Sequence, residues 1–170
     1  MGTGLLICGR LPKPLLMGGT GSESENQFMP DILPDRGEAG TLNVPGIAGL
    51  EAGIRLVAQR NPEQIGRQEQ RLLAEFAREL SKAGMEVFSG PSQLGTLSFR
   101  AGNDCQESAD RLSELGFALR AGLHCAPLAH KSAGTLTTGT IRLSISPDTP
   151  ADTPTRLARA VQTSLTPFQR

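Results

Sequence analysis

Residues 120–131 read RAGLHCAPLAHK, which places one thiol, both histidines of the chain and two permanent cations in a single short stretch. The thiolate is the nucleophilic form of cysteine, and neighbouring Arg, Lys or protonated His favours that charged form. Cys125 is therefore the first candidate for chemistry. It follows a predicted strand and precedes Pro127, which indicates a loop that can present a nucleophile. On residue types alone, a packed structural cysteine is the alternative.

A small α/β domain with an antiparallel sheet is predicted around this loop, with helices on one face of the sheet. Strand 95–100 alternates, since Leu97 and Phe99 face one way and Thr96 and Ser98 the other. Further strands are expected at 85–88, 117–119 and 140–146, the last with Ile141, Leu143 and Ile145 pointing inward. A helix capped by Asp104 should bury Ala109, Leu112 and Leu115, and a last helix from Asp152 carries Leu157, Val161 and Leu165 four apart.

The first part of the chain combines irregular segments with two helices. Residues 4–8 form an apolar run that we interpret as a buried strand whose partner strands are absent from the chain, and residues 10–45 lack clear periodicity. A helix is predicted at 45–59, with Ile47, Leu50, Ile54 and Val57 on one face. Asn61 and Pro62 begin a second helix up to Gly84, with a core stripe of Ile65, Leu72, Leu73, Phe76 and Leu80.

Three more side chains near Cys125 are candidates for a site. Arg142 lies between Thr140 and Ser144 on the polar face of its strand, where its fork of donors suits a carboxylate; a surface salt bridge is the alternative. His124 and His130 can tune the thiol or donate a proton, although His130 could also be a helix-packing residue. The spacing of the two histidines does not define a metal site, so no metal is expected.

Composition excludes several classes of protein. The 170 residues contain 17 basic and 17 acidic side chains, no Trp or Tyr and six Phe, so neither the charge nor the stacking surface of a nucleic-acid binder is present. Residues 18–22 are glycine-rich but lack the lysine and spacing of a P-loop. Three cysteines without a signal-peptide pattern favour reduced thiols in the cytoplasm, with Cys8 and Cys105 structural. The apolar run at 4–8 is too short to span a membrane.

The loop at 120–131 resembles the catalytic loop of the cysteine desulfurases and selenocysteine lyases, which are pyridoxal phosphate (PLP) enzymes of the class-V aminotransferase family. Residues 37–50, GEAGTLNVPGIAGL, resemble the family's dimer-interface segment, and residues 138–144, TGTIRLS, resemble its substrate-arginine strand. The resemblance implies an α/β fold: the C-terminal small lobe of a fold-type-I PLP transferase, with the last strand, dimer arm and helix of the large domain. Residues 1–60 would be the remnant of the large cofactor-binding domain, and residues 61–170 the small domain.

The resemblance also implies a reaction and its residues. Cys125 would take sulfur from L-cysteine, or selenium from selenocysteine, as a persulfide and release alanine, with His124 as a second catalytic residue. Arg142 would bind the substrate α-carboxylate, and Arg120 would hold the loop or the charged substrate. Thr41 would reach the phosphate of PLP in the opposite subunit of a homodimer. A sulfur-acceptor protein and a place in iron–sulfur cluster assembly are further implications.

The family's cofactor lysine has no equivalent here. It is expected upstream of Gly2, together with the histidine that stacks on the cofactor and the aspartate that pairs with its ring nitrogen; Lys13, Lys82 and Lys131 all stand outside the motif. We therefore expect the chain to represent the C-terminal part of the enzyme. Two alternatives stay open: an inactive lobe that acts in dimerisation or protein binding, and a sulfur carrier in which Cys125 accepts persulfide without a cofactor.

Overall fold

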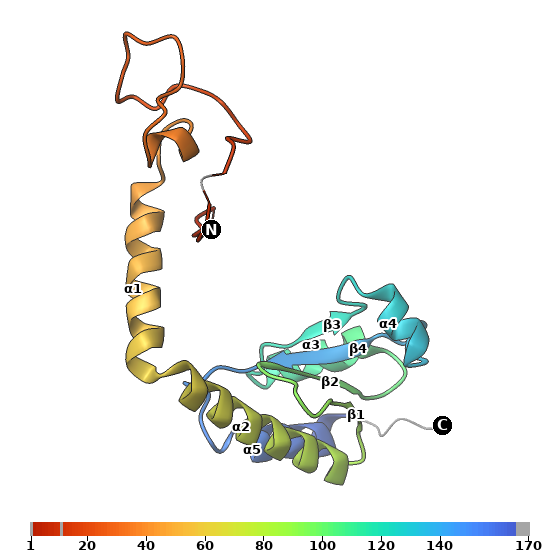
Figure 1. Cartoon of the computed structure of the whole chain (residues 1–170). Coiled ribbons are helices and arrows are strands. Elements are labelled where there is room, and N and C mark those ends of the chain that lie inside the picture. The colour runs from red at the N-terminus through yellow and green to blue at the C-terminus, as the bar shows by residue number, and fades with distance from the viewer. Residues whose placement is uncertain (1, 11, 166–170) are drawn as a thin grey trace. The chain divides into compact units, whose positions relative to one another are not determined.

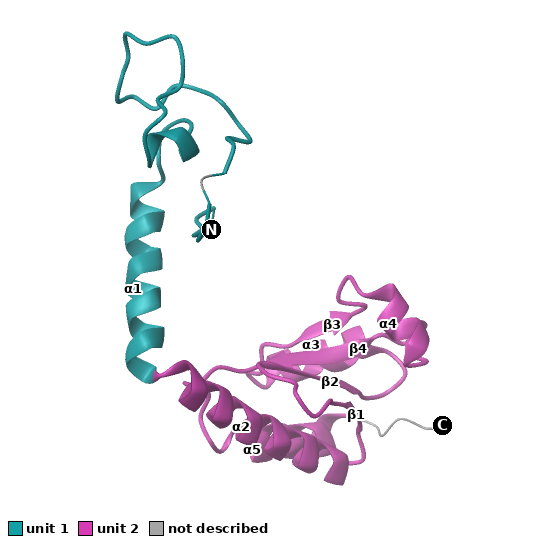
Figure 2. Ribbon diagram, in the orientation of Figure 1, with its two compact units in different colours: residues 1–60 teal, residues 61–170 magenta. Residues whose placement is uncertain are grey.

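The computed structural model describes residues 2–10 and 12–165, and the chain divides into two units. The units are Met1–Arg60 and Asn61–Arg170, coloured separately in Figure 2, and residues 166–170 of the second lie outside the described part. The roles that we assigned to residues 1–60 and 61–170 stay predictions. None of the described helices is long and apolar enough to cross a membrane.

The first unit contains one long helix. Helix α1 spans Val44–Arg60, close to the predicted bounds, and a short 3-10 turn, η1, spans Asp35–Gly37. The predicted strand at 4–8 is wrong: these residues form no strand, and Leu5, Leu6 and Ile7 are exposed. A strand needs a neighbouring strand to bond its backbone, and these residues pair with none in the described part of the chain.

The second unit is built on a four-stranded antiparallel sheet, as predicted. The strands are β1 Glu86–Phe88, β2 Thr96–Arg100, β3 Arg120–Gly122 and β4 Thr140–Ser144, in the order β1-β2-β4-β3. The strand predicted at 117–119 is wrong in its position, because the observed strand β3 begins at Arg120, after the predicted one ends. The N–H of Phe117 still donates to the carbonyl of Leu112 at the end of the preceding helix, so pairing with β4 begins only at Arg120.

Three helices pack together with the sheet (Figure 1). Helix α2, Pro62–Lys82, contacts β1 and β2; α3, Cys105–Glu114, contacts β3 and β4; α5, Thr153–Ser164, contacts both helices. Asn61 and Asp104 cap α2 and α3 through side-chain hydrogen bonds, as predicted. Leu115 was expected to be buried but is exposed, because it ends α3 as its C-cap.

The apolar face of the sheet forms the core with these helices. Its buried members include Leu72, Phe76, Leu80, Leu97, Phe99, Leu112, Ile141, Leu143, Leu157 and Val161. The other face carries polar residues of β2 and β4, including Ser98, Arg142 and Ser144. Helix α4, Pro127–Ser132, borders this face, since it lines a cavity with Ser98 and Thr140. The expectation of helices on one face therefore fails for α4.

Candidate active site

Cys125 lies on the loop between β3 and α4, and its side chain is exposed. His124 and Cys125 have φ angles of 52° and 60°, in the left-handed region that side chains other than glycine rarely adopt. Such a backbone costs about 1–3 kcal/mol per residue and persists only where its surroundings hold it. The loop at Cys125 therefore needs fixed contacts on either side, and the two histidines make them.

His124 contacts β4 through its ring. Its Nε2 lies 3.2 Å from both the backbone oxygen and the hydroxyl of Thr140. Because a carbonyl can only accept, Nε2 carries the proton and donates it, which leaves Nδ1 unprotonated. Nδ1 is buried and has no hydrogen-bond partner among residues 2–10 and 12–165. Burial lowers the pKa of His124, and the neighbouring Arg142 lowers it further. His124 is thus a neutral imidazole near neutral pH, and its buried Nδ1 acceptor is unused by the described residues.

Arg142 lies on the polar face of β4 and forms no ion pair with an acidic side chain of the described residues. Its side chain is half-buried, and its Nε is buried with no hydrogen bond to any described residue. Its cross-strand neighbours are Ser98 on β2 and Arg120 on β3. Like charges directly opposite each other destabilise a sheet pair. The alternative of a surface salt bridge finds no acidic partner in the described part, and the two guanidiniums suit a bound anion.

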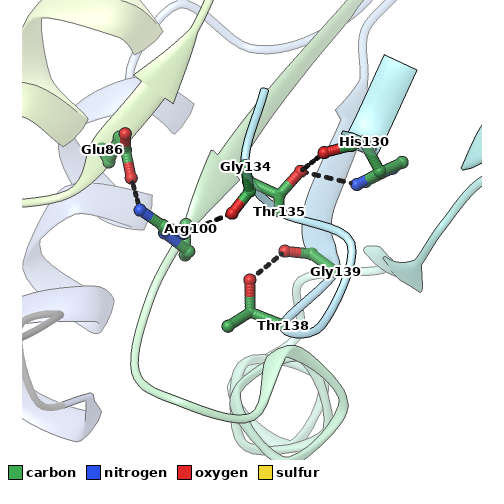
Figure 3. Close-up of polar contacts among 7 residues, drawn as sticks. All are labelled: Glu86, Arg100, His130, Gly134, Thr135, Thr138 and Gly139. Atoms are coloured by element: carbon green, nitrogen blue, oxygen red, sulfur yellow. Dashed lines mark hydrogen bonds and ion pairs between the residues drawn. The ribbon is translucent and has the colours of Figure 1, made fainter. Parts of the chain in front are cut away.

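His130 is the buried residue of α4, which agrees with the packing alternative. Its Nδ1 lies 2.8 Å from the hydroxyl of Thr135, a contact drawn in Figure 3. Its ring centroid is 5.8 Å from that of His124. The structure therefore brings both histidines to the segment that presents Cys125. A cavity of about 150 Å³ borders His130 and is lined also by Phe88, Ser98, Ala129, Ala133, Thr135 and Thr140.

Thr41 belongs to the first unit and is exposed. It follows Gly40, which has a φ of +90° and donates its N–H to the carbonyl of Gly19 at 2.8 Å. The hydroxyl of Thr41 makes no hydrogen bond with any residue that the structure describes. This leaves the hydroxyl open to an external acceptor or donor.

The other two thiols differ from Cys125. Cys8 was expected to be structural but is exposed, whereas Cys105 is buried as expected. Burial raises the pKa of the Cys105 thiol, which makes it a poor nucleophile. No group of three metal-binding side chains is found within residues 2–10 and 12–165.

Sequence reasoning missed two residues of this region. Thr140 was placed on the polar face beside Arg142 but was not predicted to contact His124, which the structure shows it does. Cys105 contacts the turn at Gly139, where an added Cβ would lie 2.7 Å from its sulfur. No local pattern indicates that contact.

Comparisons with known proteins indicate a family for the chain. The class-V aminotransferase family matches residues 1–153 of the chain. A probable cysteine desulfurase of Methanothermobacter thermautotrophicus is 35% identical over 156 residues, which is 85% of this chain and 39% of the relative. A probable cysteine desulfurase of Xylella fastidiosa is 38% identical over 96 residues, covering 55% of this chain and 23% of the relative.

Solved structures give the same class. The apo cysteine desulfurase of Thermococcus onnurineus superimposes with a TM-score of 0.75 at 26% identity, covering 88% of this chain and 38% of that structure. The cysteine desulfurase CsdA of Escherichia coli superimposes with a TM-score of 0.74 at 30% identity, covering 89% of this chain and 38% of that structure. The fold is thus part of a PLP-dependent transferase of fold type I, as predicted.

The chain belongs to the class-V aminotransferase family and is similar to its cysteine desulfurases. It spans about two-fifths of the length of the Methanothermobacter relative, 39%.

Proposed function

We propose that residues 61–170 form the substrate side of a PLP-dependent cysteine desulfurase, in which Cys125 takes sulfur from L-cysteine. The observation that carries the proposal is Arg142, a half-buried cation whose Nε has no hydrogen-bond partner among the described residues and whose pair on the neighbouring strand β3 is a second arginine, Arg120. An α-carboxylate would bind the Arg142 fork through two parallel hydrogen bonds. It would also relieve the repulsion between the two guanidiniums.

Cys125 supplies the nucleophile in this proposal. Its exposed sulfur attacks the sulfur of the bound cysteine as the thiol proton is removed, and a new bond joins the two sulfur atoms. The bond between that sulfur and the β-carbon breaks, and its electron pair stays with the carbon. The carbon takes up a proton and leaves in alanine, while Cys125 keeps a persulfide. With selenocysteine, the same step would leave selenium on Cys125.

His124 can take the proton of the thiol in the same step. Its Nδ1 is unprotonated, because Nε2 carries the proton that bonds Thr140, and this buried atom accepts no hydrogen bond from the described residues. A neutral imidazole is the form that accepts a proton, and the lowered pKa of His124 keeps the ring in that form near neutral pH. His124 would thus act as a base beside the nucleophile.

PLP, when bound, supplies the electron sink that this chemistry requires of an amino-acid substrate. Thr41 fits a contact to its phosphate, because the hydroxyl is exposed and beside a backbone turn at Gly40. In this proposal Thr41 reaches the cofactor of the partner subunit in a homodimer. Residues 1–60 would then belong to the large domain and residues 61–170 would be the small domain. The persulfide would pass to an acceptor protein, with iron–sulfur cluster assembly as its use.

The test measures where sulfur goes. The chain is incubated with PLP and L-cysteine, both alone and mixed with the N-terminal part of the Methanothermobacter relative. Alanine is quantified, and each thiol is mapped by mass spectrometry for one added sulfur atom. We expect alanine and a persulfide on Cys125 in the mixture, loss of both in Cys125→Ser, and retention of both in the matched control Cys8→Ser.

Two outcomes would contradict the proposal. Sulfur transfer retained in Cys125→Ser would remove Cys125 from the nucleophile's role. A mixture that binds PLP and cysteine but leaves Cys125 without persulfide would favour the reading of this chain as a lobe without activity.

A further inference from the structure

The loop that carries Cys125 is followed by a helix with one buried anchor. Helix α4 has six residues, and His130 is its buried member, with 6% of the residue exposed. Its partner Thr135, on the turn after α4, is 1% exposed. A buried polar pair of this kind is costly to break, because neither group can turn to water instead. The pair therefore ties α4 to the turn that follows it.

The contacts of Thr135 define the direction of each hydrogen bond. Its hydroxyl lies 2.8 Å from Nδ1 of His130 and 3.5 Å from the backbone oxygen of His130, to which it donates. Both contacts are hydrogen bonds at once only if Nδ1–H of His130 donates to the hydroxyl. In Figure 3, dashed lines join the hydroxyl of Thr135 to both of these atoms of His130. The imidazole of His130 is thus set in its Nδ1–H form.

The backbone of Thr135 extends the anchor to β4. Its N–H donates to the carbonyl of His130 at 2.9 Å, and its carbonyl accepts from Gly139 at 2.8 Å. Gly139 directly precedes Thr140, the residue that binds His124. Hydrogen bonds from both sides of Cys125 therefore lead to residues 139–140 at the start of β4. His124 makes the contact before the cysteine and His130 the contact after it.

We propose that His130 and Thr135 are positioning residues that hold the Cys125 loop in its left-handed backbone conformation. That conformation is unfavourable by itself at His124 and Cys125, so a single anchor would leave one side of the loop free to relax. The His124–Thr140 contact anchors the loop before Cys125. The His130–Thr135 contact anchors it after Cys125. That this anchor serves sulfur transfer rests on the proposed function, whereas the anchoring of the Cys125 loop does not depend on it.

The experiment compares three variants of the full chain by amide hydrogen exchange. Thr135→Val removes the hydroxyl at nearly constant shape, and Thr135→Ser restores it. Ser108→Ala is the matched control, because Ser108 is also buried and its hydroxyl donates to the carbonyl of Ala101 at 3.0 Å. The reporters are the amides of Ala126 and His130, which donate to Leu123 and Ala126.

Loss of one buried hydrogen bond predicts an increase of about tenfold in exchange at these two amides in Thr135→Val. Thr135→Ser should return to the wild-type rate, and Ser108→Ala should not accelerate these amides selectively. Equal exchange in Thr135→Val and the wild type would overturn the proposal. So would the same acceleration in Ser108→Ala, because the effect would then be general loosening.

A measurement on the unmodified chain covers the case in which Thr135→Val does not fold. NMR with ¹⁵N-labelled histidine should detect a slowly exchanging imidazole proton on Nδ1 of His130, as the two contacts of the Thr135 hydroxyl together require. A rapidly exchanging proton there would contradict the anchor. Neither measurement depends on PLP, so failure of the anchor is distinguished from failure of Cys125 as the sulfur acceptor.

Discussion

Helices α1 and α2 both carry apolar residues at helical spacing but differ in whether those residues are buried. Helix α2 buries Leu72, Phe76 and Leu80 within the second unit, where it packs with α5, β1 and β2. Helix α1 has no buried residue, although Ile54 and Val57 recur on its predicted apolar face. The period of a sequence predicts an amphipathic helix, whereas burial requires a partner with a matching surface. The stability of the second unit should therefore depend on α2 side chains, with little dependence on those of α1.

The largest expected effect is that of Phe76→Ala in α2. Phe76 is 2% exposed, and deletion of a buried phenylalanine side chain costs about 3–5 kcal/mol of unfolding free energy. The matched change in α1 is Ile54→Ala; Ile54 is 50% exposed, so we expect a change within about 0.5 kcal/mol. Urea unfolding followed by circular dichroism gives both values. Similar losses in the two variants would contradict the comparison.

A change at the turn before β4 should have the next largest effect. Gly139 has a φ of +65°, and an added Cβ would lie 2.7 Å from the sulfur of Cys105 and 3.2 Å from the backbone of Gly122. Gly139→Ala should therefore cost about 2–4 kcal/mol from overpacking and backbone strain. Gly116→Ala is the control, because its φ is +87° but no atom lies within 4 Å of the added Cβ. Equal losses at the two glycines would show that crowding at Gly139 contributes nothing.

A smaller effect is expected from the protonation of His124. Burial is the main cause of its lowered pKa, so the unfolded chain binds more protons than the folded chain between the folded pKa and the ordinary value. The contribution of His124 to stability is complete above its ordinary pKa, about 6.5. This contribution decreases as the pH falls below the ordinary pKa, and it stops changing once the pH is below the pKa of His124 in the folded chain.

His124→Asn removes this titration and keeps a residue that tolerates the left-handed backbone. Urea midpoints measured across mildly acidic and neutral pH should fall less steeply toward acid in the variant than in the wild type. Identical pH profiles would mean that His124 does not titrate differently in the folded chain.

Local patterns were sufficient to predict much of the second unit. Asp104 was recognised as a cap because a side-chain acceptor before a helix satisfies free N–H groups, and the structure shows those bonds. The alternation of Leu97 and Phe99 gave the correct buried face of β2. The pairing of Arg120 with Arg142 was not predictable from either strand alone, because it depends on the strand order and on the register of β3 against β4.

Features that depend on distant contacts were not predictable in the same way. Residues 4–8 have a strand-like composition but form no strand, because pairing is a property of two segments. The contact of Cys105 with Gly139 joins a helix start to a turn, and the spacing of neither residue signals it. The Nδ1–H form of His130 follows only from the geometry at Thr135.

The central proposal is that Arg142 binds a carboxylate beside the exposed thiol of Cys125. Its most direct test is the rate of Cys125 alkylation by iodoacetate, which carries a carboxylate, relative to neutral iodoacetamide. Mass mapping resolves each thiol, and exposed Cys8 is the internal reference. We predict that Arg142→Ala lowers this ratio at Cys125 about fivefold, the equivalent of roughly 1 kcal/mol, and leaves Cys8 unchanged. An unchanged ratio at Cys125 in Arg142→Ala would contradict the account.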